Sequence, residues 1–169
     1  MINYNKQHID KKDIASAVNV LKSDFLTQGK QIAKFENKLK LFFNCKYVCA
    51  VSSGTAALHL SAISLNFNKN DLILLSPITF VASANCVLYC NAKVDFIDID
   101  PIYYTIDPIA LENRLKFYKK NKKKIKALIV TDYAGQPSDW KKIKHLSKKY
   151  KFFLINDNCH ALGAKYLGR

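Results

Sequence analysis

The sequence predicts an α/β protein in which helices cover both faces of a mostly parallel β-sheet. Apolar residues alternate along the chain between helical spacing and short, continuous runs. Continuous apolar runs are typical of strands buried on both faces, as they are in parallel sheets. Small or polar residues follow several of these runs directly, and ligands in such folds gather beyond the carboxyl ends of the strands.

The predicted elements follow one another in a regular order. Two amphipathic helices are expected over residues 10–24 and 32–43, and Asp10 is suited to cap the first of them. A strand over 46–53 and a helix over 54–65 come next. Strands are then expected over 71–77, 92–100, 126–134 and 151–157, with helices over 80–90, 108–120 and 139–150. Five strands and their helices predict one three-layer α/β/α domain.

The composition is that of a folded protein with reduced cysteines. The 169 residues suffice for one ordinary domain, and 49% of them are hydrophobic. Five cysteines, an odd number, without an apolar N-terminal signal are typical of a cytoplasmic protein. No stretch is long and apolar enough to span a bilayer. Two pairs of cysteines have CxxxC spacing and could bind a metal together: Cys45 with Cys49, and Cys86 with Cys90. They lack the tight CxxC turn of structural zinc sites, so packing in the core is the favoured interpretation.

The formal net charge of +14 raises nucleic acid as an alternative partner. The densest block of charge is KKNKKKIK, at residues 119–126. Only Arg114 and Arg169 are arginines, whereas proteins that read bases or phosphates favour the arginine fork. The charge is therefore interpreted mainly as a surface property. A nucleic-acid-binding module would instead show salt-dependent binding to any duplex.

The stretch SSGTAAL, at residues 52–58, places small residues where a strand is expected to turn into a helix. Gly54, Thr55 and Ala56 would lie in the first helical turn, whose unpaired backbone N–H groups attract an anion such as phosphate. Neither a P-loop nor a dinucleotide fingerprint is present. An ordinary helix N-cap explains the same residues.

Two further segments follow predicted strands. Phe80 comes at the start of a helix, where its ring could lie flat against a planar ligand or pack in the core. Gln136, in the turn that follows the strand 126–134, could donate a hydrogen bond to a hydroxyl or ring substituent. Asp132 could be a second carboxylate of the site, or a residue that caps a helix or stabilises a turn.

The stretch NDNCHA contains a carboxylate, a thiol and an imidazole. Asp157 ends an apolar strand, where an unpaired carboxylate is costly to bury, and a ligand such as a pyridinium ring could be its partner. A nucleophilic pair of Cys159 and His160 is least favoured, because neighbours on a strand point to opposite faces.

These motifs together resemble the large domain of fold type I pyridoxal-phosphate (PLP) enzymes, and more closely the DegT/StrS-type nucleotide-sugar aminotransferases. The resemblance covers nearly the whole chain in the family's order. Within the family, the chain is most similar to the branch that aminates C4 of a UDP-linked 4-keto-6-deoxy sugar for pseudaminic acid. The stretches LKSDFLTQG and SPITFVASANCVLYCNAKVDFIDIDP carry the similarity to this branch. The family resemblance as a whole is carried by SDFLTQGKQIAKFE, SSGTAALHLSAISL, SPITFVASANCVLYCNAKVDFIDID, AGQPSDWKKI and NDNCHALGAKYLG.

The resemblance implies a role for each motif. Gly54, Thr55 and Ala56 would hold the phosphate of PLP, and Phe80 would stack on its ring. Asp157 would pair with the pyridine nitrogen, and His160 would lie near the ring and its 3-hydroxyl. The remaining implied residues are Gln136, facing the cofactor or sugar, and Thr27, Gln28 and Gly29, lining the sugar pocket.

The chain also departs from the family pattern. Relatives often show Glu-Asp-Ala-Ser/Ala-His/Gln where this chain has Asn156 to His160. The family's Schiff-base lysine belongs to a Ser-Phe-x-x-x-Lys motif downstream of HALGA, and no lysine here matches that position. Residues 1–169 are therefore expected to be an N-terminal segment plus most of the PLP-binding large domain, without the small C-terminal domain. On their own they are expected to have no aminotransferase activity.

The resemblance further implies the partners of the full-length protein. These are a nucleotide sugar, an amino-acid donor such as glutamate, and a second copy in a homodimer, with neither nucleic acid nor membrane. Two alternatives stay open. A relative with histidine in place of the lysine would be a sugar dehydratase that uses PLP or its amine form (PMP), and a chain that ends here would be a non-catalytic fragment.

Overall fold

The computed structural model describes residues 6–27 and 29–168. The chain divides after Ala50 into two compact units, which are described separately. The first unit contains helices α1 (Lys11–Leu21) and α2 (Lys30–Phe42). The predicted cap is confirmed, because the Asp10 carboxylate accepts hydrogen bonds from the backbone N–H groups of Lys12 and Asp13. In return, the Asp13 carboxylate accepts from the Asp10 N–H at 2.9 Å, which completes a capping box.

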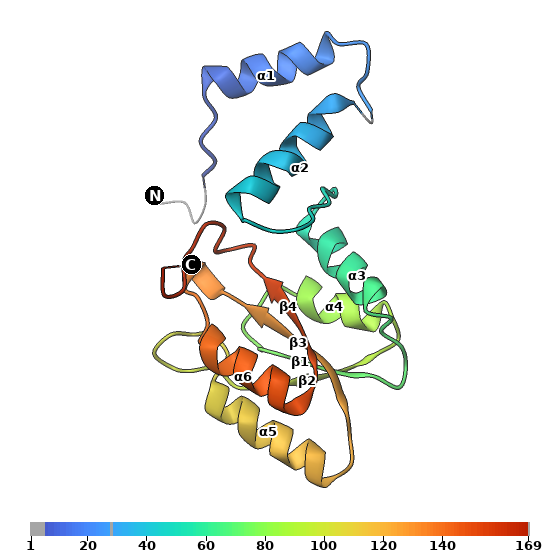
Figure 1. Cartoon of the computed structure of the whole chain (residues 1–169), viewed down its shortest axis with the longest axis vertical. Coiled ribbons are helices and arrows are strands. Elements are labelled where there is room, and N and C mark those ends of the chain that lie inside the picture. The colour runs from blue at the N-terminus through green and yellow to red at the C-terminus, as the bar shows by residue number, and fades with distance from the viewer. Residues whose placement is uncertain (1–5, 28, 169) are drawn as a thin grey trace. The chain divides into compact units, whose positions relative to one another are not determined.

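The second unit begins at Val51 and contains a four-stranded parallel sheet in the order β2-β1-β3-β4 (Figure 1). Helices precede the sheet and connect its strands, so the alternation expected from the sequence is confirmed from α3 onward. In chain order, the elements are α3 (Gly54–Ser64), β1 (Leu72–Leu75), α4 (Ala82–Leu88), β2 (Lys93–Phe96), α5 (Pro108–Lys120), β3 (Ile125–Thr131), the 3₁₀ turn η1 (Tyr133–Gly135), α6 (Trp140–Tyr150) and β4 (Phe153–Asp157).

The sheet is the middle of three layers, as predicted. Helices α3 and α4 cover one face, and α5 and α6 cover the other (Figure 1). Successive strand residues point to opposite faces of the sheet and so pack into two separate hydrophobic cores. Ile73 and Ile129 pack with α3 and α4, whereas Leu74 and Leu128 pack with α5 and α6. These four side chains of the central strands β1 and β3 are completely buried, and burial on both faces explains the continuous apolar runs of these two strands.

The strand predicted over residues 46–53 is wrong, and the described sheet has four strands rather than five. A strand needs a neighbour that pairs with its backbone, and these residues pair with no strand among residues 6–27 and 29–168. The backbone N–H of Ala50 instead donates to the Glu36 carboxylate at 2.8 Å. The described helices include none that is long and apolar enough to cross a membrane.

Asp132 proves to be a structural carboxylate. It is 4% exposed and follows β3 directly. One oxygen accepts the backbone N–H of Ser138 at 2.8 Å, and the indole N–H of Trp140 lies 3.2 Å from each oxygen. The Asn156 amide donates to the other oxygen at 3.3 Å. Asp132 therefore ties the start of α6 to the ends of β3 and β4.

Replacing this carboxylate tests its structural role. Asp132→Ala removes the acceptor of three donors, of which the Ser138 N–H is fully buried, and should lower the free energy of unfolding by about 2–4 kcal/mol, measured by urea denaturation. Asp139→Ala is the matched control, since Asp139 caps α6, accepts from the Tyr166 hydroxyl and pairs with Lys142 at a less buried position, and its loss should cost about 1 kcal/mol. A loss in Asp132→Ala no larger than in the control would contradict this role.

Candidate active site

A cavity of about 230 Å³ opens at the carboxyl edge of the sheet. The strands β1 and β3 are neighbours, but the chain continues from β1 to β2 on one side of the sheet and from β3 to β4 on the other. Such topological switch points are where α/β proteins bind ligands. The cavity combines the start of α3 with residues that follow β1, the last residue of β3, and residues at and after the end of β4. Its lining consists of Gly54, Thr55, Leu58, Phe80, Ala82, Thr131, Asp157, Cys159 and His160.

The N-terminus of α3 supplies free hydrogen-bond donors to this cavity. The Ser53 side chain caps the helix by accepting the Ala56 N–H at 3.1 Å, and the Ser53 carbonyl accepts the Ala57 N–H at 3.0 Å. Within the described part of the chain, the N–H groups of Gly54 and Thr55 have no acceptor. These two groups and the positive end of the helix suit an anion.

Gly54 also allows the start of α3 to lie close to Cys159. A Cβ atom at this position would lie 2.9 Å from the Cys159 sulfur, too close for an undisturbed contact. The absence of a side chain at Gly54 therefore lets the start of α3 lie directly against the segment that follows β4.

Asp157 is the buried carboxylate of the cavity, with 5% of its surface exposed. One oxygen accepts a hydrogen bond of 2.6 Å from the Ser83 hydroxyl, and the other is 3.4 Å from the Cys159 N–H. Among the residues that the structure describes, Asp157 forms no ion pair with a lysine, an arginine or a histidine. A cationic ligand group in the cavity would supply the missing partner.

A chain of hydroxyl groups leads to this carboxylate. Thr131 and Thr79 lie 2.7 Å apart at their hydroxyl oxygens, and Thr79 lies 2.9 Å from the Ser83 hydroxyl. The Ser83 hydroxyl has one hydrogen, which it donates in the hydrogen bond to Asp157, so its oxygen must accept from Thr79. Thr79 must in turn accept from Thr131. The three hydroxyls therefore form a one-directional chain that orients Asp157.

The Cys159 thiol is poorly suited to act as a nucleophile. Burial of the thiol, followed by its hydrogen bond to the Asp157 carboxylate, raises its pKa to about 11. Cys159 and His160 follow β4 rather than belonging to it, so the alternation argument made from the sequence was wrong, and both residues line the same cavity. The high pKa, not the geometry, opposes a Cys–His pair.

The cavity unites most of the residues predicted for the cofactor and leaves others elsewhere. Gly54, Thr55, Phe80, Asp157 and His160 line it, while Ala56 follows directly in α3. Phe80 lies just before α4 and is 64% exposed, so it is not a core residue.

The other predicted residues lie apart from this cavity. Gln136 lines a separate cavity of about 370 Å³, and its amide donates to the Pro137 carbonyl at 3.1 Å. Thr27 and Gly29, the N-cap of α2, belong to the first unit, and Gln28 lies outside the described residues. No cluster of three metal-binding side chains occurs in the described parts of the chain.

Sequence reasoning missed Thr79, Ser83 and Thr131. Thr79 and Ser83 lie four residues apart, but Thr79 is 52 residues from Thr131 and Ser83 is 74 residues from Asp157, so no single motif contains the chain. Their positions beside the predicted strand ends were the only available signal.

The Ser83 hydroxyl can be tested by its removal. Ser83→Ala leaves one Asp157 oxygen without its donor and the Thr79 hydroxyl without its acceptor, both in a buried region. The free energy of unfolding should fall by about 1–3 kcal/mol in urea denaturation. Ser64→Ala removes an exposed hydroxyl bonded to a carbonyl of its own helix and should change it by less than about 0.5 kcal/mol. Equal effects of the two substitutions would argue against the chain.

The raised pKa of Cys159 predicts slow alkylation. A pKa near 11 instead of 9.0 leaves about a hundredfold less thiolate at pH 8, so iodoacetamide should modify Cys159 about a hundredfold more slowly than an unperturbed cysteine peptide. The rate should keep rising up to about pH 11, as followed by mass spectrometry of the Cys159 peptide. A rate that levels off below pH 9 would show that the thiol is not held protonated.

Comparison with known proteins gives a consistent result. The sequence profile of the DegT/DnrJ/EryC1/StrS aminotransferase family matches residues 7–169. A UDP-4-amino-4,6-dideoxy-N-acetyl-beta-L-altrosamine transaminase of Campylobacter jejuni is 41% identical over 169 residues, which are 100% of this chain and 44% of that protein. The chain thus spans less than half the length of this relative.

Two solved structures have a fold similar to that of this chain. Helicobacter pylori PseC, an aminotransferase involved in the biosynthesis of pseudoaminic acid, has a TM-score of 0.87 and 32% identity, with 99% of this chain and 44% of that chain covered. NtdA of Bacillus subtilis, solved with bound cofactor PMP, has a TM-score of 0.82 and 27% identity over 95% of this chain and 36% of that chain. The chain belongs to the DegT/DnrJ/EryC1/StrS aminotransferase family.

Proposed function

We propose that this chain forms the PLP-binding part of an aminotransferase that acts on a nucleotide-linked keto sugar. The observation that carries the proposal is the cavity at the carboxyl edge of the sheet. A buried carboxylate and two backbone N–H groups line it, and among residues 6–27 and 29–168 the carboxylate has no cationic partner and the N–H groups have no acceptor. One end of the cavity suits a cation and the other an anion. PLP presents both, a pyridinium nitrogen and a phosphate, on one flat ring.

The residues fit such a group in their chemistry. The N–H groups of Gly54 and Thr55 would bind the phosphate, with the Thr55 hydroxyl beside them. Asp157, oriented by Ser83, would hold the proton on the ring nitrogen, and the exposed Phe80 ring would lie against the cofactor face. The bound cofactor supplies an electron sink for the reaction. The cofactor prediction is supported by the related structure that contains PMP.

The substrate follows from the relatives rather than from the cavity. A curated relative is named as a transaminase of a UDP-linked amino sugar, and PseC is described as taking part in pseudoaminic acid biosynthesis. A UDP-linked 4-keto-6-deoxy amino sugar, with glutamate as amino donor, is therefore the proposed substrate pair. The homodimer and the sugar-pocket roles of Thr27, Gln28, Gly29 and Gln136 belong to the same proposal.

The cavity also bears on the activity of the chain alone. None of the residues described as lining the cavity is a lysine. Covalent attachment of PLP therefore needs a lysine that is not among these lining residues. We therefore expect no turnover from the 169-residue chain, with residues 51–169 serving as part of a larger PLP domain.

The cofactor assignment can be tested without a Schiff base. PMP binds without a covalent link, so calorimetric titration of the chain with PMP isolates the contacts of the cavity. Asp157→Ala should weaken PMP binding by about 10- to 100-fold, because the buried charged hydrogen bond to the ring nitrogen is lost. Asp98→Ala, which removes an exposed carboxylate outside the cavity, should leave the affinity unchanged.

A second titration examines the phosphate end. Pyridoxamine without its phosphate should bind more weakly than PMP to the unmodified chain, because the Gly54 and Thr55 donors lose their anion. Equal PMP affinity in Asp157→Ala and the unmodified chain would refute the assignment of the ring nitrogen.

A further inference from the structure

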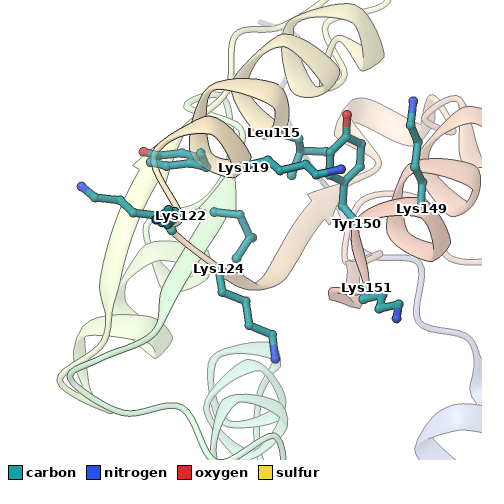
Figure 2. Close-up of a pocket in the computed structure, with 10 residues that line it drawn as sticks. Leu115, Lys119, Lys122, Lys124, Lys149, Tyr150 and Lys151 are labelled. Carbon is teal, nitrogen blue, oxygen red and sulfur yellow. The ribbon is translucent and has the colours of Figure 1, made fainter.

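A second cavity, of about 290 Å³, lies at the opposite end of the sheet, where β3 begins and α5 and α6 end (Figure 2). Strand β3 is seven residues long, so about 20 Å separates this end from the carboxyl edge. We call this cavity the lysine pocket, because six lysines line it: Lys119, Lys122, Lys123, Lys124, Lys149 and Lys151.

The positive charge of the lysine pocket is largely unbalanced. Lys149 pairs with the Glu112 carboxylate at 2.7 Å, while the other five lysines form no ion pair within the described residues. The C-terminal ends of α5 and α6 offset only about one charge between them. Since like charges held on a concave surface repel one another, the pocket gains stability when an anion enters it.

The backbone gives a second, independent indication. Helices α2 to α6 all end in the same way. A backbone N–H just after the helix donates to the carbonyl five residues earlier, and the residue directly before this donor has a positive φ. In α2, α3 and α4 this residue is asparagine, which tolerates the left-handed conformation; these residues are Asn44, Asn66 and Asn91. In α5 and α6 it is lysine.

The two lysines of positive φ are Lys122 and Lys151, with φ of 54° and 57°, and both line the lysine pocket. Lysine has no conformational advantage at such a position, where asparagine or glycine costs less. Strained residues of this kind cluster at ligand-binding sites, so the two lysines indicate a role for their side chains. The strain and the unbalanced charge therefore indicate the same cavity.

We propose that the lysine pocket binds a compact, multiply charged phosphate anion of the oligophosphate class. Ammonium groups on flexible stems can each reach a different phosphate oxygen, without the fixed planar geometry that an arginine requires. The concave shape favours a compact anion over a flat membrane surface or a duplex. The Tyr118 hydroxyl contributes no donor, because it already donates to Asp95 at 2.7 Å.

The test uses inorganic tripolyphosphate as the probe and calorimetry at low salt as the measurement. The unmodified chain should bind it, with an affinity that falls as salt is added. The double variant Lys122→Asn/Lys151→Asn should bind at least tenfold more weakly. Because asparagine relieves the strain at both positions, its unfolding temperature should stay equal or rise. This combination separates a lost ligand contact from a damaged fold.

A matched control removes the same charge from a different place. Lys141→Gln/Lys144→Gln changes two exposed lysines of α6 that do not line the pocket and should bind tripolyphosphate almost as tightly as the unmodified chain. Lys119→Gln/Lys123→Gln provides a second pocket variant at positions of ordinary backbone geometry, and its affinity should also fall at least tenfold.

Several results would overturn the proposal. One is the absence of tripolyphosphate binding, and another is an affinity in both pocket variants equal to that of the unmodified chain. A third is a loss of affinity in the control equal to that in the pocket variants, which would show that only the net charge matters. Binding only to phosphatidylglycerol vesicles or to a DNA duplex, without tripolyphosphate binding, would also reject a compact anion in favour of an extended surface.

Discussion

The burial of the Asp157 carboxylate at the end of β4 is the constraint on which the candidate site depends. A carboxylate in that position requires donors, and the chain supplies Ser83 from α4 and the backbone N–H of Cys159. These contacts place α4 and the segment after β4 around one cavity. The parallel sheet makes this possible, because its strands deliver their carboxyl ends to the same edge.

A comparison of two neighbouring carboxylates shows how position decides role. Asp132 and Asp157 follow adjacent strands and are almost equally buried. Asp132 is surrounded by protein donors and binds the start of α6, so its hydrogen-bonding capacity is used within the fold. Asp157 borders the cavity and keeps capacity for a ligand. Residue type alone would not distinguish them.

The sequence predicted those features that depend on nearby residues. The helices lie close to their expected bounds, and Asp10 caps α1, because periodicity and capping act over a few positions. The strand over 46–53 failed because pairing needs a distant partner. The hydroxyl chain also escaped prediction, since Thr131 and Thr79 are 52 residues apart and only the fold brings them together. Phe80 and Asp157 were predicted from their places just after and at the end of apolar runs that do form strands, whereas Gly54 was predicted from the small residues at a helix start, although the strand expected before it does not form.

The fixed direction of the hydroxyl chain has a consequence for how this protein can evolve. Each hydroxyl donates a hydrogen bond to the next acceptor, so losing Thr79 or Ser83 leaves the hydroxyl before it without an acceptor and the group after it without a donor. Losing several together leaves fewer such groups. Thr79, Ser83 and Thr131 are therefore not independent positions, and natural variants should exchange them as a set rather than one at a time.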